Sequence, residues 1–384
     1  MREILAVLAV LTVCSAAPSQ VTRPVVSHQD GTVAKLADEF LSKREFSGVV
    51  LMARDGRVLF EKAYGLANRE LTVRNKLETK FRLGSVTKQF TAMAVMILAE
   101  RGKVRLTDPI CEYVENCPKA WTAITVRHLL THTSGIPSFT DFPDNDQYER
   151  LPMTPLATIA RFRDKQLDFA PGERFTYSNS GYLLLGYIIE RVSGEKYEDF
   201  LRKNIYEPLG MLDSGYDHPR VVLKDRASGY AKENGLMVNA MYMEMDTPFG
   251  GGSMYSTVGD LLRWDQALYT EKLVSEKSLT QIFAATDVPY PKGWWSRHKY
   301  GFGWFLTNWF GRNLIWHEGG PHGFASAILR YPEDRTVVVV LENMEEFEPG
   351  EYWDINEEPM VVANGLSAIA FGLPPNTNPI SLAH

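Results

Sequence analysis

The stretch Gly84-Ser85-Val86-Thr87-Lys88 leads directly into an apolar run that ends at Arg101-Gly102. This pattern predicts a buried helix with a glycine stop, so that Ser85 stands at the helix N-terminus. Free backbone N–H groups and the helix dipole favour developing negative charge there. Ser85 and Lys88 are three residues apart, which places both side chains on one face of the helix. Lys88 can activate the serine if burial and nearby cations lower its pKa from about 10.4 towards neutrality.

The same Ser-x-x-Lys spacing occurs at two other places, Ser193 with Lys196 and Ser296 with Lys299. The context separates them from the first pair. Ser193 abuts a glycine after a helical pattern, which is typical of a C-terminal turn, and Ser296 lies in a tryptophan-rich segment with no helix behind it. Ser85 is therefore the predicted nucleophile.

A second motif, Tyr177-Ser178-Asn179, follows Pro171-Gly172 and precedes an apolar helical pattern. This places it in a loop just before a buried helix, where functional side chains are often held. A tyrosine can carry a proton if cations stabilise its phenolate, and Asn179 offers both a donor and an acceptor to a substrate amide. The alternative is a tyrosine that packs in a loop and an asparagine that serves as a turn or cap residue.

The third motif, His317-Glu318-Gly319-Gly320, follows the short strand pattern of residues 313–316. Glycines at 319 and 320 would let a substrate come close to a strand edge. The alternative is a hairpin end with a surface histidine. In this order the three motifs supply a nucleophile, its base, a second proton carrier and a backbone edge, which is what acyl transfer through a serine ester needs.

With these motifs the chain resembles the serine β-lactamase and penicillin-recognising family. It is most similar to the class C β-lactamase branch, which includes esterases, D-aminopeptidases and D-alanyl-D-alanine carboxypeptidases. The resemblance covers roughly residues 33–345. It also rests on the segments Leu106-Thr107-Asp108-Pro109, Thr125-Val126-Arg127-His128-Leu129-Leu130-Thr131-His132-Thr133-Ser134-Gly135, Pro171-Gly172-Glu173, Tyr206-Glu207-Pro208-Leu209-Gly210-Met211 and Gly251-Gly252-Ser253-Met254-Tyr255-Ser256-Thr257.

The resemblance implies a role for each motif residue. Ser85 would be the acylated nucleophile, Lys88 its partner, and Tyr177 the general base of acylation and of the attacking water. Asn179 would orient the substrate, and the backbone N–H groups of Ser85 and Gly320 would form the oxyanion hole. His317 and Gly319 complete the substrate-binding set.

No cofactor or metal is expected. His128 and His132 are four residues apart, but Leu129 stands where a zinc protease would carry glutamate.

One departure from the family pattern bears on the substrate. Most lactamases of this branch carry Lys-Thr-Gly where this chain has His317-Glu318-Gly319. Histidine is shorter and mostly neutral near pH 7, so it is a weaker anchor for a substrate carboxylate and a weaker support for a tyrosine phenolate. We therefore expect cleavage of small esters or amides, with a rate that climbs to an optimum near or above about pH 8.

The alternatives are a true β-lactamase, a D-alanyl-D-alanine carboxypeptidase, or a binder of penicillin or cell-wall peptide without turnover. A binder would usually show a broken proton relay, whereas all three relay residues are present here.

The fold expected is α+β and β-lactamase/transpeptidase-like, an antiparallel sheet flanked by helices. Strand patterns span residues 46–53, 57–64, 300–306, 314–316, 323–331 and 336–341, and a final helix spans about 357–371. Strands from both ends of the chain would join one sheet, with a mainly helical lobe of about residues 86–240 inserted between them. The catalytic domain would cover residues 31–372, and residues 373–384 would form a loose tail.

The start of the chain is typical of an export signal. An apolar run, residues 4–13, precedes small residues with an expected cut near Ala17, and residues 18–30 would form a disordered leader. The run is too short to span a membrane, and valine directly before Cys14 fits a lipid-attachment site poorly. We expect an exported protein, periplasmic or secreted, in which Cys111 and Cys117 form a local disulfide or remain two free thiols.

The charge balance bears on the partners. The formal net charge is −6 and there is no basic block, so nucleic acid is not an expected partner. The partner expected is a small-molecule ester, amide or peptide substrate, and the oligomeric state is left open.

Overall fold

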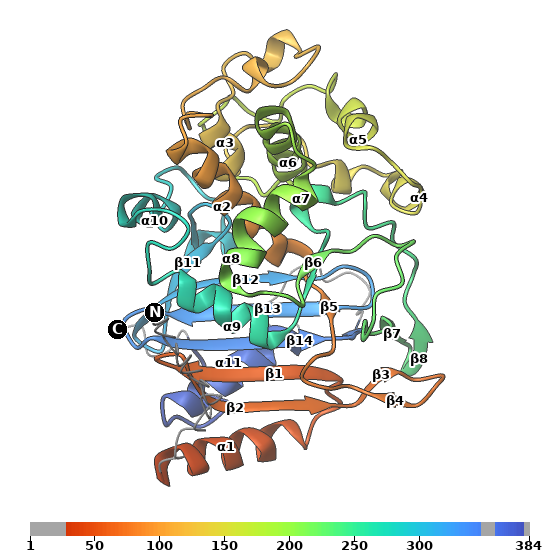
Figure 1. The fold of residues 1–384 in the computed structure, drawn as a ribbon, viewed down its shortest axis with the longest axis vertical. Coiled ribbons are helices and arrows are strands. Elements are labelled where there is room, and N and C mark those ends of the chain that lie inside the picture. Colours follow the sequence, from red (N-terminus) through yellow and green to blue (C-terminus); the bar gives the residue numbers. More distant parts are fainter. Residues whose placement is uncertain (1–27, 347–357, 380–384) are drawn as a thin grey trace, which may run out of the picture.

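The computed structural model describes residues 28–346 and 358–379. Its centre is a seven-stranded sheet in the order β10-β11-β12-β13-β14-β1-β2, with antiparallel neighbours throughout. The strands are β1 (Gly48–Arg54), β2 (Arg57–Tyr64), β10 (Lys299–Tyr300), β11 (Phe305–Trp309), β12 (Arg312–Gly319), β13 (Ala325–Tyr331) and β14 (Thr336–Glu342). The predicted α+β fold is confirmed, because strands from both ends of the chain meet in one sheet (Figure 1).

Helices cover both faces of this sheet. The helix α11 (Glu358–Ala370) packs on β13 and β14, beside α1 (His28–Leu41), while α9 (Val258–Ala267) lies on the opposite face (Figure 1). Val338 and Val340 of β14 belong to the apolar core on the α11 side, whereas Val337 and Val339 belong to the larger core that runs into the helical lobe. Alternate side chains of a strand point to opposite faces, so this valine run is buried on both.

The inserted lobe is built around two buried helices, α2 (Thr87–Glu100) and α6 (Asn179–Ser193), which pack on each other. Around them lie α3 (Val126–Leu130), α4 (Asn145–Tyr148), α5 (Pro155–Phe162), α7 (Tyr197–Leu201), the π-helical turn η5 (Arg202–Tyr206) and α8 (Glu207–Leu209). Residues Thr87 to Leu98 of α2 are all buried, which explains why apolar side chains occur on every side of the helix. The helix α10 (Glu276–Ile282) lies beyond this lobe in the sequence.

Short strands connect the lobe to the main sheet. They are β3 (Leu66–Asn68) with β4 (Val73–Arg74), the group β5 (Phe81–Arg82), β9 (Met254–Ser256) and β6 (Gly215–Tyr216), and the group β15 (Met344–Glu346), β7 (Tyr230–Glu233) and β8 (Leu236–Asn239). The sequence predicts a mainly helical lobe over about residues 86–240, so the strands β6, β7 and β8 within it are a difference from the prediction. Each is only two to four residues long, which leaves little periodic signal in the sequence.

The predicted elements otherwise differ from the structure mainly at their ends. The turn Asp55-Gly56 joins β1 and β2 with positive φ angles of 51° and 72°, as is typical of a two-residue hairpin turn. The final helix begins and ends within one residue of its expected bounds. The strand β12 extends to Gly319, so the His317 motif lies inside a strand and not after it. The helix α1 begins at His28, inside the segment assigned to a leader, and residues 1–27 with the predicted export signal lie outside the described residues.

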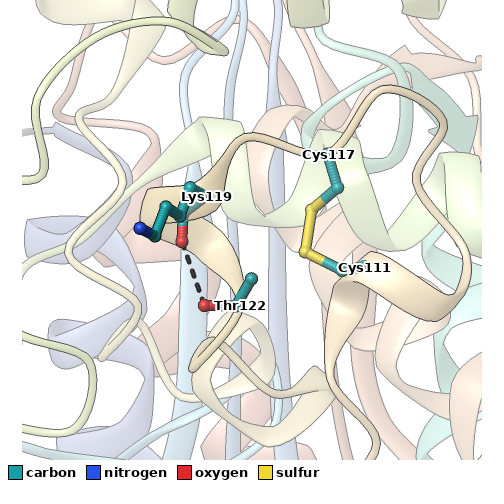
Figure 2. The surroundings of a disulfide bond; sticks show 4 residues. All are labelled: Cys111, Cys117, Lys119 and Thr122. Carbon is teal, nitrogen blue, oxygen red and sulfur yellow. Dashed lines mark hydrogen bonds between the residues drawn. A yellow bond between two sulfur atoms is a disulfide. The ribbon is translucent and has the colours of Figure 1, made fainter.

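A disulfide joins Cys111 and Cys117 across a short loop of the helical lobe (Figure 2). The loop lies between the 3-10 turns η2 (Ile110–Glu112) and η3 (Lys119–Trp121), and the Thr122 hydroxyl donates to the Lys119 carbonyl at 2.9 Å beside it. Of the two sequence-based alternatives, the bonded pair is the one present. Within the described part of the chain, no helix has the length and apolar character needed to span a membrane.

Candidate active site

Ser85 lies in a single 3-10 turn, η1 (Gly84–Val86), immediately before α2. Gly84 has a φ of +51°, and a Cβ there would come within 2.9 Å of the Gly320 nitrogen. A Cβ on Gly319 would in turn come within 2.6 Å of the Ser85 nitrogen. These glycines therefore allow the backbone before α2 to lie directly against the end of β12. This brings the N–H groups of Ser85 and Gly320 to one place, as an oxyanion hole requires.

Lys88, in the first turn of α2, is fully buried beside Ser85. Its Nζ is 3.0 Å from the Ser85 Oγ, 2.8 Å from the Asn179 Oδ1 and 2.8 Å from the Gly251 carbonyl oxygen. The two carbonyl oxygens can only accept, so they take two N–H donors and leave the third direction of the amine for the serine. Burial holds the pKa of Lys88 well below its usual value. A neutral Lys88 would then direct its lone pair at the serine hydroxyl.

Tyr177 ends the loop before α6 and lies beside the same pair. Its ring is half-buried while its hydroxyl oxygen is buried, and the Lys88 Nζ lies 4.9 Å from the ring centroid. Burial raises the pKa of Tyr177, the hydrogen bond with the Ser85 side chain lowers it, and the charge of Glu318 raises it. The net direction is upward. A tyrosine that acts as a phenolate base in the resting enzyme would need a lowered pKa. This environment instead raises the pKa of Tyr177.

Asn179 is the first residue of α6, and protein partners engage both ends of its amide. Its Oδ1 accepts from Lys88, and its Nδ2 donates to the Thr140 Oγ at 3.1 Å. Its backbone N–H donates to the Ser138 hydroxyl at 3.1 Å. Asn179 therefore orients the lysine amine in this structure. Gly251, Ser138 and Thr140 were not singled out as site residues in the sequence. Gly251 lies in the turn η6 (Phe249–Gly251), and Ser138 and Thr140 lie at the turn η4 (Phe139–Asp141), both far along the chain from the three motifs.

His317 is buried in β12 and has both ring nitrogens engaged. Its Nδ1 is 2.7 Å from the Glu318 carbonyl oxygen and its Nε2 is 3.0 Å from the Tyr300 hydroxyl. The carbonyl can only accept, so Nδ1 carries the proton and Nε2 accepts from the tyrosine. Burial, helped by the charge of Lys88, lowers the pKa of His317 to about 3. The histidine is neutral at any working pH, as expected from the sequence, and it is not a permanent cation at the site.

A second buried histidine, His132, supports Tyr177 from the other side. Its ring centroid is 4.3 Å from that of Tyr177, and its Nδ1 accepts the Ser178 backbone N–H at 3.1 Å. No cluster of three or more metal-ligating side chains occurs among the described residues.

Other residues singled out in the sequence lie away from this group. Ser193 ends α6 before Gly194, which is left-handed with a φ of +73°, and the Ser296 hydroxyl donates to the carbonyl of residue 293. Because neither serine is beside a buried lysine amine in the way that Ser85 is, the choice of Ser85 among the three Ser-x-x-Lys pairs fits the geometry.

An ion pair that the sequence did not predict joins the two sides of the site. The Nε2 of His322, two residues beyond Gly320, is 2.8 Å from Oε1 of Glu149, which lies between α4 and α5. Glu345 of β15 faces the other ring nitrogen at 4.0 Å. Glu149 is 173 positions away from His322 in the chain, so no local pattern could indicate the pair. It ties the loop after Gly320 to the helical lobe.

We predict that this ion pair makes the folded state less stable as the pH rises. The hydrogen bond and charge of Glu149 raise the pKa of His322 above 6.5, while burial and Arg150 oppose them. The stabilisation that protonated His322 gives to the folded state is complete below about pH 6.5. It is lost as the pH rises through the pKa of His322 in the folded protein. Burial and the charge of Glu233 raise the pKa of Glu345 to about 7, so its ionisation acts in the same direction. Between pH 6 and 8, the Tm of the wild type should fall by about 2–4 °C more than that of His322→Gln.

Thermal unfolding at matched ionic strength measures this difference, with Glu345→Gln as the companion variant that removes the second titrating group. Equal slopes of Tm against pH in wild type and His322→Gln would contradict the prediction.

Comparisons with known proteins identify the family and the fold of this chain. The family model described as Beta-lactamase matches residues 33–357. The chain is 30% identical over 321 residues to Penicillin-binding protein 4* of Bacillus subtilis, a match that covers 79% of this chain and 69% of that protein. It superposes on an octameric penicillin-binding protein homologue from Pyrococcus abyssi with a TM-score of 0.77 and 33% identity, covering 92% of this chain and 79% of that one. A D-amino acid amidase from Ochrobactrum anthropi shares the fold, with a TM-score of 0.75 at 22% identity over 90% of this chain and 99% of that one.

Proposed function

Because this chain belongs to the β-lactamase family, we propose that it is a serine hydrolase that forms an acyl-enzyme on Ser85 and cleaves small esters or amides. The observation that carries the proposal is the 3.0 Å contact between the buried Lys88 amine and the Ser85 hydroxyl. Burial lowers the pKa of the Lys88 amine. Two carbonyl oxygens accept its N–H groups, so that its lone pair points at the serine hydroxyl. A nucleophile with such a base beside it is what acyl transfer requires.

The proton transfers can be followed from this starting state. When Ser85 attacks the carbonyl carbon, its proton passes to the Lys88 amine, and the leaving group takes the proton of the Tyr177 hydroxyl. The acyl-enzyme then stands beside a lysine ammonium and a tyrosine phenolate. The phenolate takes a proton from the attacking water, the acyl group leaves, and the ammonium returns a proton to Ser85. All three groups end as they began.

This sequence of steps fits the electrostatics of the site. Tyr177 acts as a base only after the ammonium has formed nearby, and the Lys88 Nζ lies 4.9 Å from the tyrosine ring centroid. The raised tyrosine pKa in the resting state is then an advantage, because the hydroxyl keeps the proton that the leaving group needs. The developing oxyanion would be stabilised by the backbone N–H groups of Ser85 and Gly320.

The substrate proposed is one that needs no carboxylate anchor at β12. His317 is neutral and its ring nitrogens already have protein partners, so it offers no charge to a penicillin carboxylate. The relatives named as penicillin-binding proteins favour a second candidate, acylation by a β-lactam or a cell-wall peptide. We further propose export to the periplasm or medium, on the basis of the apolar run at residues 4–13, and placement in the class C-like branch.

We predict that p-nitrophenyl butyrate is cleaved with a kcat/KM at least about tenfold above that of nitrocefin, since one charge-assisted hydrogen bond is missing for the lactam. Initial rates on the purified protein measure both values. A nitrocefin kcat/KM equal to or above that of the ester would reject this preference and support the second candidate.

A panel of short-chain nitrophenyl esters, nitrocefin, and D-amino-acid amides and peptides tests the proposed function as a whole. Mass spectrometry of the trapped protein should place the acyl group on the peptide that contains Ser85. Absence of turnover and of any acylated species across the panel would overturn the proposal.

A further inference from the structure

A cavity of 520 Å³ lies against the loop that follows the oxyanion-hole glycine. Its lining includes three arginines, Arg82, Arg220 and Arg226, together with His322 of that loop. None of the described residues that line it is acidic. The chain as a whole carries a net charge of −6, whereas the lining of this cavity has three guanidinium groups and no carboxylate. The lining is therefore positively charged on a negatively charged protein. We call this cavity the arginine pocket.

The positive charge of the arginine pocket is only partly compensated. Asp217, whose side chain is fully buried, accepts from the Arg82 Nε at 2.7 Å and from the Arg226 Nη1 at 2.5 Å. One carboxylate between two guanidinium groups leaves an excess of one positive charge on these three residues. Elsewhere in the lining, His322 pairs with Glu149 and the Tyr242 hydroxyl donates to Glu244. Arg220 adds another positive charge at the exposed rim. Because a guanidinium carries five N–H donors, these arginines retain capacity for an incoming carboxylate.

Several other residues of the lining are apolar and exposed, although Ser228 also lines the pocket. Val222 is 99% exposed and Val221 is 53% exposed, although both are large aliphatic side chains. Met241 and Tyr242 face the cavity from the segment after β8 and are also exposed. Phe324 forms part of the wall, with the Arg82 guanidinium 5.5 Å from its ring centroid. A cationic floor with an apolar rim suits a carboxylate carried on a short hydrocarbon segment.

The arginine pocket and the candidate active site share a wall. Arg82 is three residues before Ser85, and His322 and Phe324 follow Gly320 on the loop between β12 and β13. The Phe324 N–H donates to the Pro321 carbonyl at 2.9 Å, which folds this loop tightly. A Cβ on Gly84 would come within 2.8 Å of the Pro321 ring, so the same loop also touches the Ser85 turn. A substrate held at Ser85 can therefore extend past this loop.

We propose that the arginine pocket binds a carboxylate at the end of the ester or amide substrate remote from the bond that is cleaved, through Arg220 and Arg226. This inference rests on the proposed function and names the substrate class for it. The apolar rim holds the methylene segment and the arginines hold the charge. The carboxylate bound here is distinct from the lactam carboxylate that His317 fails to anchor, because the two positions lie on different elements.

Matched ester pairs test this. The p-nitrophenyl monoesters of succinic, glutaric and adipic acid are compared with the same compounds methylated on the free carboxylate. For at least one chain length, the wild-type kcat/KM should favour the free carboxylate by about tenfold or more, as expected for a charge-assisted contact. The ratio should fall to about one in Arg220→Gln/Arg226→Gln. It should also fall as ionic strength rises from 0.05 to 0.5 M.

The matched control is Arg263→Gln. Arg263 is a half-exposed arginine of α9 that is paired with Asp260 and does not line the pocket, so its ratio should equal that of the wild type. A second arm places the carboxylate on the leaving group, and a preference found only in that arm would overturn the assignment to the acyl side. If circular dichroism shows that the double variant is unfolded, Arg220→Gln alone is used, because its side chain forms no ion pair within the described residues.

Failure of this inference is distinguishable from failure of the proposed function. Neutral esters that are cleaved in a Ser85-dependent way with a charged-to-neutral ratio near one overturn the pocket assignment alone. If no ester is cleaved, binding of glutaric acid monoamide to Ser85→Ala is measured by calorimetry, with and without Arg220→Gln. Weaker binding after loss of Arg220 supports the pocket, and equal binding or none overturns it.

Discussion

Ser85→Ala is expected to lower kcat/KM for a short-chain ester by about 10³-fold or more and to abolish covalent labelling by a fluorophosphonate. Without the hydroxyl no ester intermediate can form, and Lys88 loses the proton donor that lies 3.0 Å from its amine. Alanine is slightly smaller than serine and lies here in the turn just before α2, so the substitution leaves the helix and its buried side chains in place. The loss should therefore appear in kcat/KM without a comparable change in Tm.

Ser193→Ala and Ser296→Ala are the matched controls, because each serine has the same spacing to a lysine as Ser85 does. Both variants should keep wild-type labelling. Labelling that survives in Ser85→Ala, or that disappears in either control, would show that the nucleophile has been assigned to the wrong residue.

Replacing the base should have the second largest effect. Lys88→Met keeps the length of a fully buried side chain but removes the amine that contacts Ser85, Asn179 and Gly251. Loss of a general base is expected to lower kcat/KM by about 10²–10⁴-fold. Single-turnover kinetics should place the loss in acylation. A Lys88→Met enzyme within tenfold of the wild type would exclude Lys88 as the base that activates the serine.

The dependence of kcat/KM on pH is an independent test of the role of Lys88. Burial holds the pKa of Lys88 well below 10.5, so the rate should rise as the amine deprotonates and level off well before that pH. Burial raises the pKa of Tyr177, so loss of its proton should not lower the rate until the pH is above about 10. His317 has a pKa of about 3, so it does not titrate between these two groups and does not change the rate in that range. The expected profile is a plateau that is reached well below pH 10.5 and holds until about pH 10.

A plateau differs from the climbing rate, with an optimum near or above about pH 8, that was expected from the sequence on the assumption that Tyr177 must ionise before it can act. A kcat/KM that still climbs steeply at pH 10, with enzyme stability checked separately, would restore Tyr177 as the titrating base.

The sequence allowed the fold and the main motifs to be predicted because the signals are local. The Asp55-Gly56 turn, the apolar helix behind Ser85 and the valine run of β14 are each visible within about a dozen residues. The lysine three residues after the serine is equally local, and the structure brings the two side chains into contact.

The charge states at the site could not be predicted in the same way, because they depend on partners far along the chain. The Lys88 amine is directed by Gly251, 163 positions later, and the tautomer of His317 depends on Tyr300 in a different strand. Asp217, which holds two arginines of the pocket, lies 135 positions from Arg82. Local spacing names the residue types but not the burial that sets their pKa values.

The place of β14 in the sheet has a consequence for synthesis. Arg54 at the end of β1 pairs with Thr336 of β14, 282 positions later in the chain. At about 5–20 residues per second, the ribosome needs about 15–55 s to make the missing strand. Throughout that interval the β1–β2 hairpin has an open edge of unpaired N–H and C=O groups, which is a template for aggregation. Chains released before β14 is made should therefore be insoluble, and coverage of that edge by a chaperone during translation should raise the yield.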